Sequence, residues 1–74
     1  PEEIDIHERQ LTGRSVGIIG FGGIGQRLAE LLAPFHCRVR AYDPFLPAEV
    51  ASKFGAELTS LDALFEQSEI VVCC

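Results

Sequence analysis

The chain has few basic residues, since 6 Lys and Arg stand against 11 Asp and Glu and give a net charge of −5. Nucleic-acid binding usually requires a basic surface, so this balance argues against a DNA or RNA partner. No apolar run approaches the length of a transmembrane helix. The start, Pro1-Glu2-Glu3, lacks the basic and apolar segments of a signal peptide. We therefore expect no nucleic-acid partner, no membrane partner and a cytoplasmic location.

Cysteine is also scarce. The three cysteines, Cys37, Cys73 and Cys74, form no C-x-x-C pair, so neither a metal motif nor a disulfide framework is indicated. Adjacent residues of a strand point to opposite faces, which makes a Cys73–Cys74 disulfide geometrically poor. We expect all three to be small apolar packing residues in a reducing compartment. The alternative for Cys74 is a reactive thiol at the end of a strand.

Glycine, in contrast, is concentrated in one motif. Gly20-Phe21-Gly22-Gly23-Ile24-Gly25 reads G-x-G-x-x-G, directly after an apolar run and before a helical pattern. In this motif the first glycine permits a tight turn, the second lets a pyrophosphate approach the backbone, and the third lets the helix pack closely on the sheet. The helix N-terminus then offers unpaired N–H groups to phosphates. The motif predicts a dinucleotide site formed by Gly20, Gly22, Gly23, Ile24 and Gly25.

Asp43 lies 23 positions after Gly20, close to the offset of about 20 residues at which an acidic residue accompanies this motif. We expect Asp43 at the end of the second strand, where its carboxylate accepts hydrogen bonds from the adenosine ribose and repels the 2′-phosphate of NADP. The predicted cofactor is therefore NAD. The alternative interpretation is a turn residue before Pro44, because Asp is common in turns.

The hydrophobic pattern predicts alternating strands and helices. Strands are expected at residues 15–19, 38–42, 56–58 and 70–74, and helices between them. The first helix should end at Pro34, the second should stop at Gly55, and the third should begin at a capping box of Thr59 and Asp62. This alternation favours an α/β fold, a partial Rossmann-type doubly wound parallel sheet with strand order 3-2-1-4.

The first helix carries an apolar stripe at helical spacing, which we expect to pack on the sheet. Its members are Ile24, Leu28, Leu31, Leu32 and Phe35. Residues 1–10 are polar and acidic, and we interpret them as a lead-in segment to a domain that starts at residue 11.

The segments LTGRSVGIIGFGGIGQ (11–26) and RAYDP (40–44) resemble the D-isomer-specific 2-hydroxyacid dehydrogenases, whose members include phosphoglycerate dehydrogenase and hydroxypyruvate reductase. The resemblance covers residues 11–74 and implies the N-terminal part of an NAD-binding domain, incomplete here. It also implies an NAD-dependent exchange between a 2-hydroxy acid and a 2-keto acid in a homodimeric protein. The backbone of Gly23 and Ile24 would contact the pyrophosphate, and Asp43 the ribose.

Two positions depart from the family pattern. Gly23 stands where the family often has a larger polar or basic residue such as Arg, so side-chain help with phosphate is lost. His36 stands where the family usually has the Gly that ends this helix, so His36 must take a left-handed conformation, which His tolerates better than most residues. We favour this capping role for His36 over a ligand role.

The family's catalytic Arg and His lie after the fourth strand, beyond Cys74, so we predict no catalytic residue here and no turnover by these 74 residues alone. His7 and His36 match neither position, and we expect structural or surface roles for both. An NAD-sensing protein without turnover, similar to the corepressors called C-terminal-binding proteins, is the alternative function. An FAD or S-adenosylmethionine site is disfavoured by the run from Gly17 to Gly20 together with Ala41 to Pro44.

Overall fold

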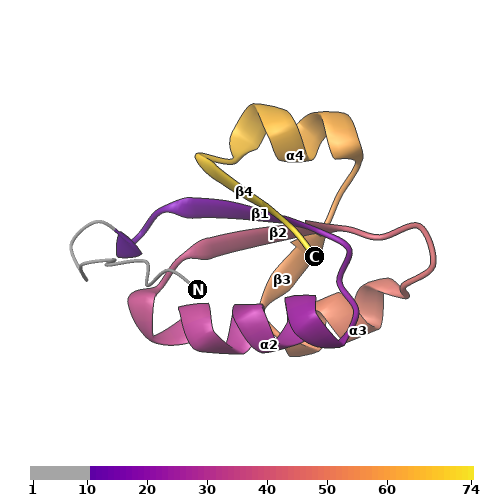
Figure 1. Ribbon diagram of the computed structural model, residues 1–74, viewed down its shortest axis with the longest axis horizontal. Helices are drawn as coiled ribbons and strands as arrows, with labels where there is room; N and C mark the ends of the chain where they lie inside the picture. The colour runs from indigo at the N-terminus through magenta and orange to yellow at the C-terminus, as the bar shows by residue number, and fades with distance from the viewer. Residues whose placement is uncertain (1–10) are drawn as a thin grey trace.

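The computed structural model describes residues 11–74, so the predicted lead-in at 1–10 and its His7 lie outside the described residues. Four parallel strands form one sheet in the order β3-β2-β1-β4. Helices α2 and α3 cover one face of the sheet and α4 covers the other (Figure 1). The elements are β1 (Ser15–Ile19), α2 (Gly23–Leu32), the 3₁₀ helix η1 (Ala33–Phe35), β2 (Arg38–Tyr42), α3 (Ala48–Lys53), β3 (Ala56–Leu58), α4 (Leu61–Gln67) and β4 (Ile70–Cys73).

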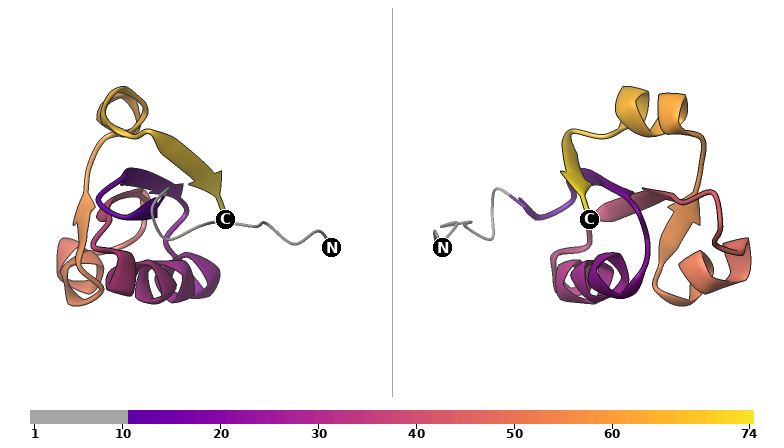
Figure 2. Two further views of the ribbon diagram at one scale, coloured as in Figure 1. Left: turned by 90° about the vertical axis from the view of Figure 1, so that its left-hand side faces the viewer. Right: turned by 45° about the vertical axis from the view of Figure 1, so that its right-hand side comes forward.

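This arrangement confirms the Rossmann-type doubly wound sheet and its strand order. The chain runs from β1 outward through β2 to β3, and then returns across the other face to place β4 on the free side of β1 (Figure 2). The register aligns Ile19 of β1 with Tyr42 of β2 and with Cys73 of β4. The carboxyl ends of these three strands are therefore level. The strand order reverses between β1 and β4, and doubly wound sheets bind ligands at such a reversal.

The inner face of α2 differs from the predicted stripe. Ile24 and Leu31 are 73% and 58% exposed, whereas the buried residues of α2 are Gly25, Ala29 and Leu32. Three of the five predicted residues do pack on the core, since Leu32 is buried and Leu28 and Phe35 are partly buried against it, and the prediction is wrong only for Ile24 and Leu31. A Cβ atom on Gly25 would lie 2.6 Å from the carbonyl oxygen of Gly20. Gly25 and Ala29 let the first part of helix α2 approach the sheet closely, and Ile24 and Leu31 are turned outward.

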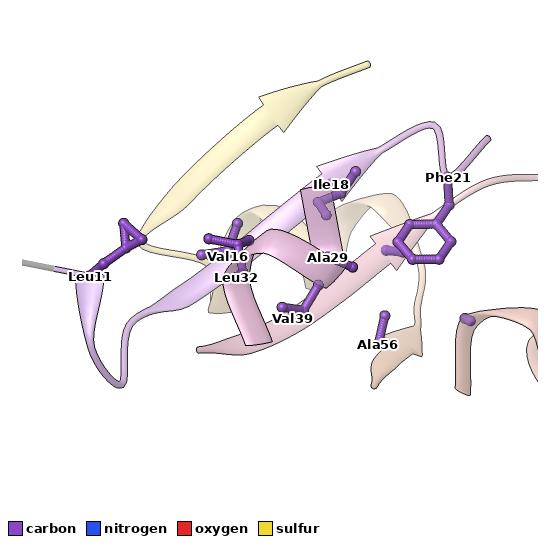
Figure 3. Packing of buried hydrophobic residues seen from close by; sticks show 10 residues of the cluster. Leu11, Val16, Ile18, Phe21, Ala29, Leu32, Val39 and Ala56 are labelled. Carbon is purple, nitrogen blue, oxygen red and sulfur yellow. The ribbon is translucent and has the colours of Figure 1, made fainter. Parts of the chain in front are cut away.

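The core between the sheet and helices α2 and α3 is formed mainly by aliphatic side chains (Figure 3). Leu11, which precedes β1, is only 7% exposed and belongs to this core. On the opposite face of the sheet, the fully buried Leu64 of α4 packs over β1. Within residues 11–74, none of the helices is both long and apolar enough to cross a bilayer.

Most helix ends agree with the sequence. Pro34 lies in η1 just after α2, and His36 takes the left-handed conformation (φ 56°) with its N–H bonded to the carbonyl oxygen of Ala33, which confirms its capping role. Gly55 follows α3 with φ 76°, as expected of a stop.

The cap of α4 is Ser60 and not Thr59, so this prediction was wrong. The Ser60 hydroxyl oxygen accepts a hydrogen bond from the Ala63 N–H at 3.1 Å. Thr59 is still held to the sheet, because its N–H donates to the carbonyl oxygen of Ala41 at 2.9 Å. The chain therefore leaves the sheet one residue later than the capping-box spacing suggested.

Two of the three cysteines are also placed differently from the prediction. Cys73 and Cys74 are exposed, because they lie at the end of β4, the edge strand of the described sheet, which stops at Cys73. Cys37 fits the packing interpretation, since it is partly buried and its thiol donates to the carbonyl oxygen of Leu11 at 3.2 Å. Burial raises the pKa of the Cys37 thiol, because it disfavours the charged thiolate.

Gly17 is predicted to be essential for the packing of α4 on the sheet. A Cβ atom at Gly17 would lie 2.6 Å from Leu64 Cδ2 and 2.5 Å from Ser68 Oγ. Gly17→Ala should therefore lower the free energy of unfolding by about 1–3 kcal/mol, the usual penalty of overpacking. Chemical denaturation measures this difference. Gly23→Ala is the matched control, because a Cβ there meets nothing within 4 Å; equal stability of the two variants would contradict the prediction.

Candidate cofactor site

A hollow of about 320 Å³ opens at the carboxyl ends of the strands, where the strand order reverses. All six residues predicted to bind the cofactor line this hollow, so the structure brings them together. Cys74 joins them from the end of β4, and the sequence pattern did not predict it as part of the lining. The lining consists of Gly20, Gly22, Gly23, Ile24, Gly25, Asp43 and Cys74.

Gly20 and Gly22 have different roles in this lining. Gly20 turns the chain out of β1 with φ 89°, and its N–H donates to the carbonyl oxygen of Tyr42 at 2.8 Å. A Cβ on Gly20 would lie 2.8 Å from the carbonyl oxygen of Cys74, whereas a Cβ on Gly22 would meet no protein atom within 4 Å. Gly20 therefore makes the tight turn, and Gly22 faces open space in which a ligand has room to contact the backbone.

Helix α2 begins at this hollow. Its first hydrogen bond runs from the Gln26 N–H to the carbonyl oxygen of Gly22 at 2.9 Å, so the N–H groups of Gly23, Ile24 and Gly25 precede the helical ladder. Gly22 supplies no side-chain cap, and the first turn carries no acidic residue. Backbone donors and the positive end of the helix dipole thus point to the hollow, an arrangement that suits phosphate oxygens.

Asp43 follows directly after β2 and is half-buried. One carboxylate oxygen, Oδ2, accepts a hydrogen bond from the Phe21 N–H at 2.9 Å, and Oδ1 accepts one from the Phe45 N–H at 3.0 Å. The bond from the Phe45 N–H spans two residues and forms an Asp turn, which was the alternative interpretation of Asp43. Asp43 therefore forms this turn and also lines the hollow. A carboxylate accepts about four hydrogen bonds, which leaves capacity for sugar hydroxyls.

Two residues that the sequence pattern did not predict, Phe21 and Gln26, support the glycine loop. Phe21 was treated as the variable position of the motif, yet its side chain is fully buried and its ring lies 5.9 Å from that of Phe54 in an edge-to-face contact. Gln26 donates a hydrogen bond from Nε2 to the carbonyl oxygen of Phe21 at 3.1 Å. The apolar character of Phe21 between two glycines was the available signal for its burial, and nothing in the sequence indicated the role of Gln26.

The donor set of the hollow fits a dinucleotide better than a metal ion. Bare glycine backbone and a helix N-terminus lie beside one carboxylate, which matches a pyrophosphate next to a ribose diol. In the part of the chain that the structure describes, no three His, Cys, Asp or Glu side chains gather as a metal site would require. His36 caps the far end of the α2–η1 segment and does not line the hollow.

Comparisons with known proteins point to one family. Residues 2–74 match the family model described as "D-isomer specific 2-hydroxyacid dehydrogenase, NAD binding domain". The chain is 44% identical over 63 residues to a D-lactate dehydrogenase of Curvularia clavata, covering 85% of this chain and 18% of that protein. It is 39% identical over 62 residues to a D-3-phosphoglycerate dehydrogenase of Mycobacterium bovis, covering 84% and 12%.

A solved structure shares the fold and was determined with the cofactor. The NAD-complexed form of a D-isomer specific 2-hydroxyacid dehydrogenase from Lactobacillus delbrueckii ssp. bulgaricus superimposes with a TM-score of 0.73 at 31% identity. The match covers 82% of this chain and 18% of that one. The chain thus spans less than a fifth of the length of these relatives. It belongs to the D-isomer-specific 2-hydroxyacid dehydrogenase family, within the NAD-binding domain, and NAD is the cofactor of that domain.

Proposed function

We propose that this chain is the cofactor-binding part of an oxidoreductase that interconverts a D-2-hydroxy acid and the corresponding 2-keto acid with NAD. The observation that carries the proposal is the convergence of the glycine loop, the N-terminus of α2 and Asp43 on one hollow. The relatives named as D-lactate and D-3-phosphoglycerate dehydrogenases support the reaction class. When bound, NAD supplies the nicotinamide that accepts or returns a hydride.

Within this proposal each of the six lining residues predicted from the sequence has one task. The backbone of Gly22, Gly23 and Ile24 binds the pyrophosphate, Gly20 and Gly25 bring that backbone close to the sheet, and Asp43 binds the adenosine ribose. Residues 11–74 then form the N-terminal part of the NAD-binding domain, preceded by the lead-in at 1–10. The short share of each relative that is covered, 18% and 12%, supports this assignment to part of a longer enzyme.

The proposed partners are inferred from the same family and from the net charge of the chain. We propose a small 2-hydroxy or 2-keto acid as substrate, a homodimer in the cytoplasm, and no nucleic-acid partner. The net charge of −5 favours the last point. The homodimer is proposed from the family resemblance alone.

Gly22→Val should abolish NAD binding by the full-length protein and leave its fold intact. The isopropyl group would enter the space in which the pyrophosphate approaches the backbone, whereas a Cβ there meets no protein atom within 4 Å. Isothermal titration calorimetry measures binding, and an unchanged melting temperature shows that the fold is retained. Near-wild-type affinity in this variant would remove the glycine loop from the cofactor site.

Asp43→Ala should weaken NAD binding by about tenfold or more and reduce the preference for NAD over NADP. Hydrogen bonds to a charged group contribute about 1.5–3 kcal/mol each, and about 1.4 kcal/mol corresponds to tenfold. Dissociation constants for both cofactors measure the effect. Glu66→Ala removes a carboxylate from the exposed face of α4 and serves as the control. The ribose assignment is wrong if Asp43→Ala binds NAD as tightly as the wild type does.

The full-length protein should reduce 2-keto acids such as glyoxylate, hydroxypyruvate or phosphohydroxypyruvate with NADH, and residues 1–74 alone should not. The reason is that the resemblance places the substrate-binding Arg and the catalytic His beyond Cys74. Loss of NADH absorbance reports the reaction. A full-length protein that binds NAD without turnover would instead be an NAD-sensing binding protein. Turnover by residues 1–74 above the rate without protein would contradict the absence of catalytic residues.

A further inference from the structure

The peptide groups of Phe21 are held on both sides by side chains from two different elements. Its N–H donates to Asp43 Oδ2 at 2.9 Å, and its carbonyl oxygen accepts from Gln26 Nε2 at 3.1 Å. The Phe21 ring adds a third restraint, because it is fully buried and contacts Phe54 at the end of α3. Figure 3 shows this ring at the far end of the packed cluster, beyond Ile18.

These restraints act where the backbone of the glycine loop is otherwise least restricted. Phe21 lies between Gly20 and Gly22, and glycine restricts backbone rotation less than any other residue. Without the restraints, the peptide between Phe21 and Gly22 could rotate and present its carbonyl oxygen to the hollow. A carbonyl oxygen that faced the phosphate would repel it. The hydrogen bond from Gln26 opposes this rotation, because it holds the Phe21 carbonyl oxygen in place.

We propose that Gln26 is a positioning residue for the binding of the cofactor pyrophosphate. Gln26 does not line the hollow, and it acts by holding the Phe21 carbonyl oxygen so that the loop keeps the orientation set by Asp43 on the other side. This inference rests on the proposed function, because it assigns a further residue to the same phosphate site. It predicts that the loss of Gln26 affects ligands with phosphates and spares ligands without them.

The test compares adenosine with ADP on the full-length protein. Adenosine contains the ribose that Asp43 is proposed to bind, and ADP adds the pyrophosphate. The ratio of the two dissociation constants therefore measures the gain in affinity from the pyrophosphate. Gln26→Leu removes the donor at similar size and should reduce this gain by about threefold to tenfold, the equivalent of one hydrogen bond. The dissociation constant of adenosine should stay within about twofold.

Gln67→Leu makes the same chemical change at the exposed end of α4 and should alter neither dissociation constant. Gln26→Glu is the second variant if Gln26→Leu does not fold, because a carboxylate in the first turns of a helix is favourable for the fold but cannot donate to the carbonyl oxygen. Its titrations are made at about 1 M salt, where the screening length is about 3 Å, so that the lost hydrogen bond dominates over charge repulsion.

The outcomes separate this inference from the proposed function. If ADP binds the wild-type protein no tighter than adenosine, the proposed phosphate site itself is wrong. If the wild type shows the gain and the Gln26 variant keeps all of it, Gln26 does not position the loop. If the Gln26 variant weakens adenosine and ADP equally, Gln26 has only a general structural role, and the inference is overturned.

Discussion

The close approach of helix α2 to the end of strand β1 is the constraint on which the site depends. A side chain at Gly25 would collide with the carbonyl oxygen of Gly20 at 2.6 Å and would press on Ile18 at 3.2 Å. With no side chain there, the first amides of α2 lie directly above the carboxyl end of the sheet. The same approach places Gly25 and Ala29 against the sheet, whereas Ile24, next to Gly25, is exposed.

The level ends of the three neighbouring strands complete the site. Because the register aligns Ile19, Tyr42 and Cys73, the next residue of β2, Asp43, reaches the glycine loop, and the next residue of β4, Cys74, lies against Gly20. Among residues 11–74, no basic side chain lines the resulting hollow. A chain with a net charge of −5 can thus present a phosphate site, because backbone N–H groups and the helix dipole provide the positive potential.

The strands, their order and the six lining residues were predictable, since they depend on hydrophobic period, glycine spacing and one acidic residue. The errors arose where the outcome depends on three-dimensional approach. Periodicity places Ile24 and Leu31 on one stripe, but it does not reveal that Gly25 and Ala29 allow a closer contact. Capping-box spacing does not reveal that Thr59 is bonded to Ala41 of the neighbouring strand. The support of Phe21 by Gln26 was equally hidden, because a side-chain bond to backbone leaves no pattern in the sequence.

If Asp43 binds the ribose as proposed, its bonds to the Phe21 and Phe45 N–H groups link the choice of cofactor to the order of the loop. A change to NADP would usually replace the acidic residue with a neutral or basic one that admits a 2′-phosphate. In this structure such a replacement also removes the acceptor of the Phe21 N–H, and an unsatisfied buried donor costs about 1–3 kcal/mol. A compensating acceptor for that N–H would be needed elsewhere. The proposed NAD preference would therefore depend on the internal structure of the loop as well as on the repulsion of a phosphate.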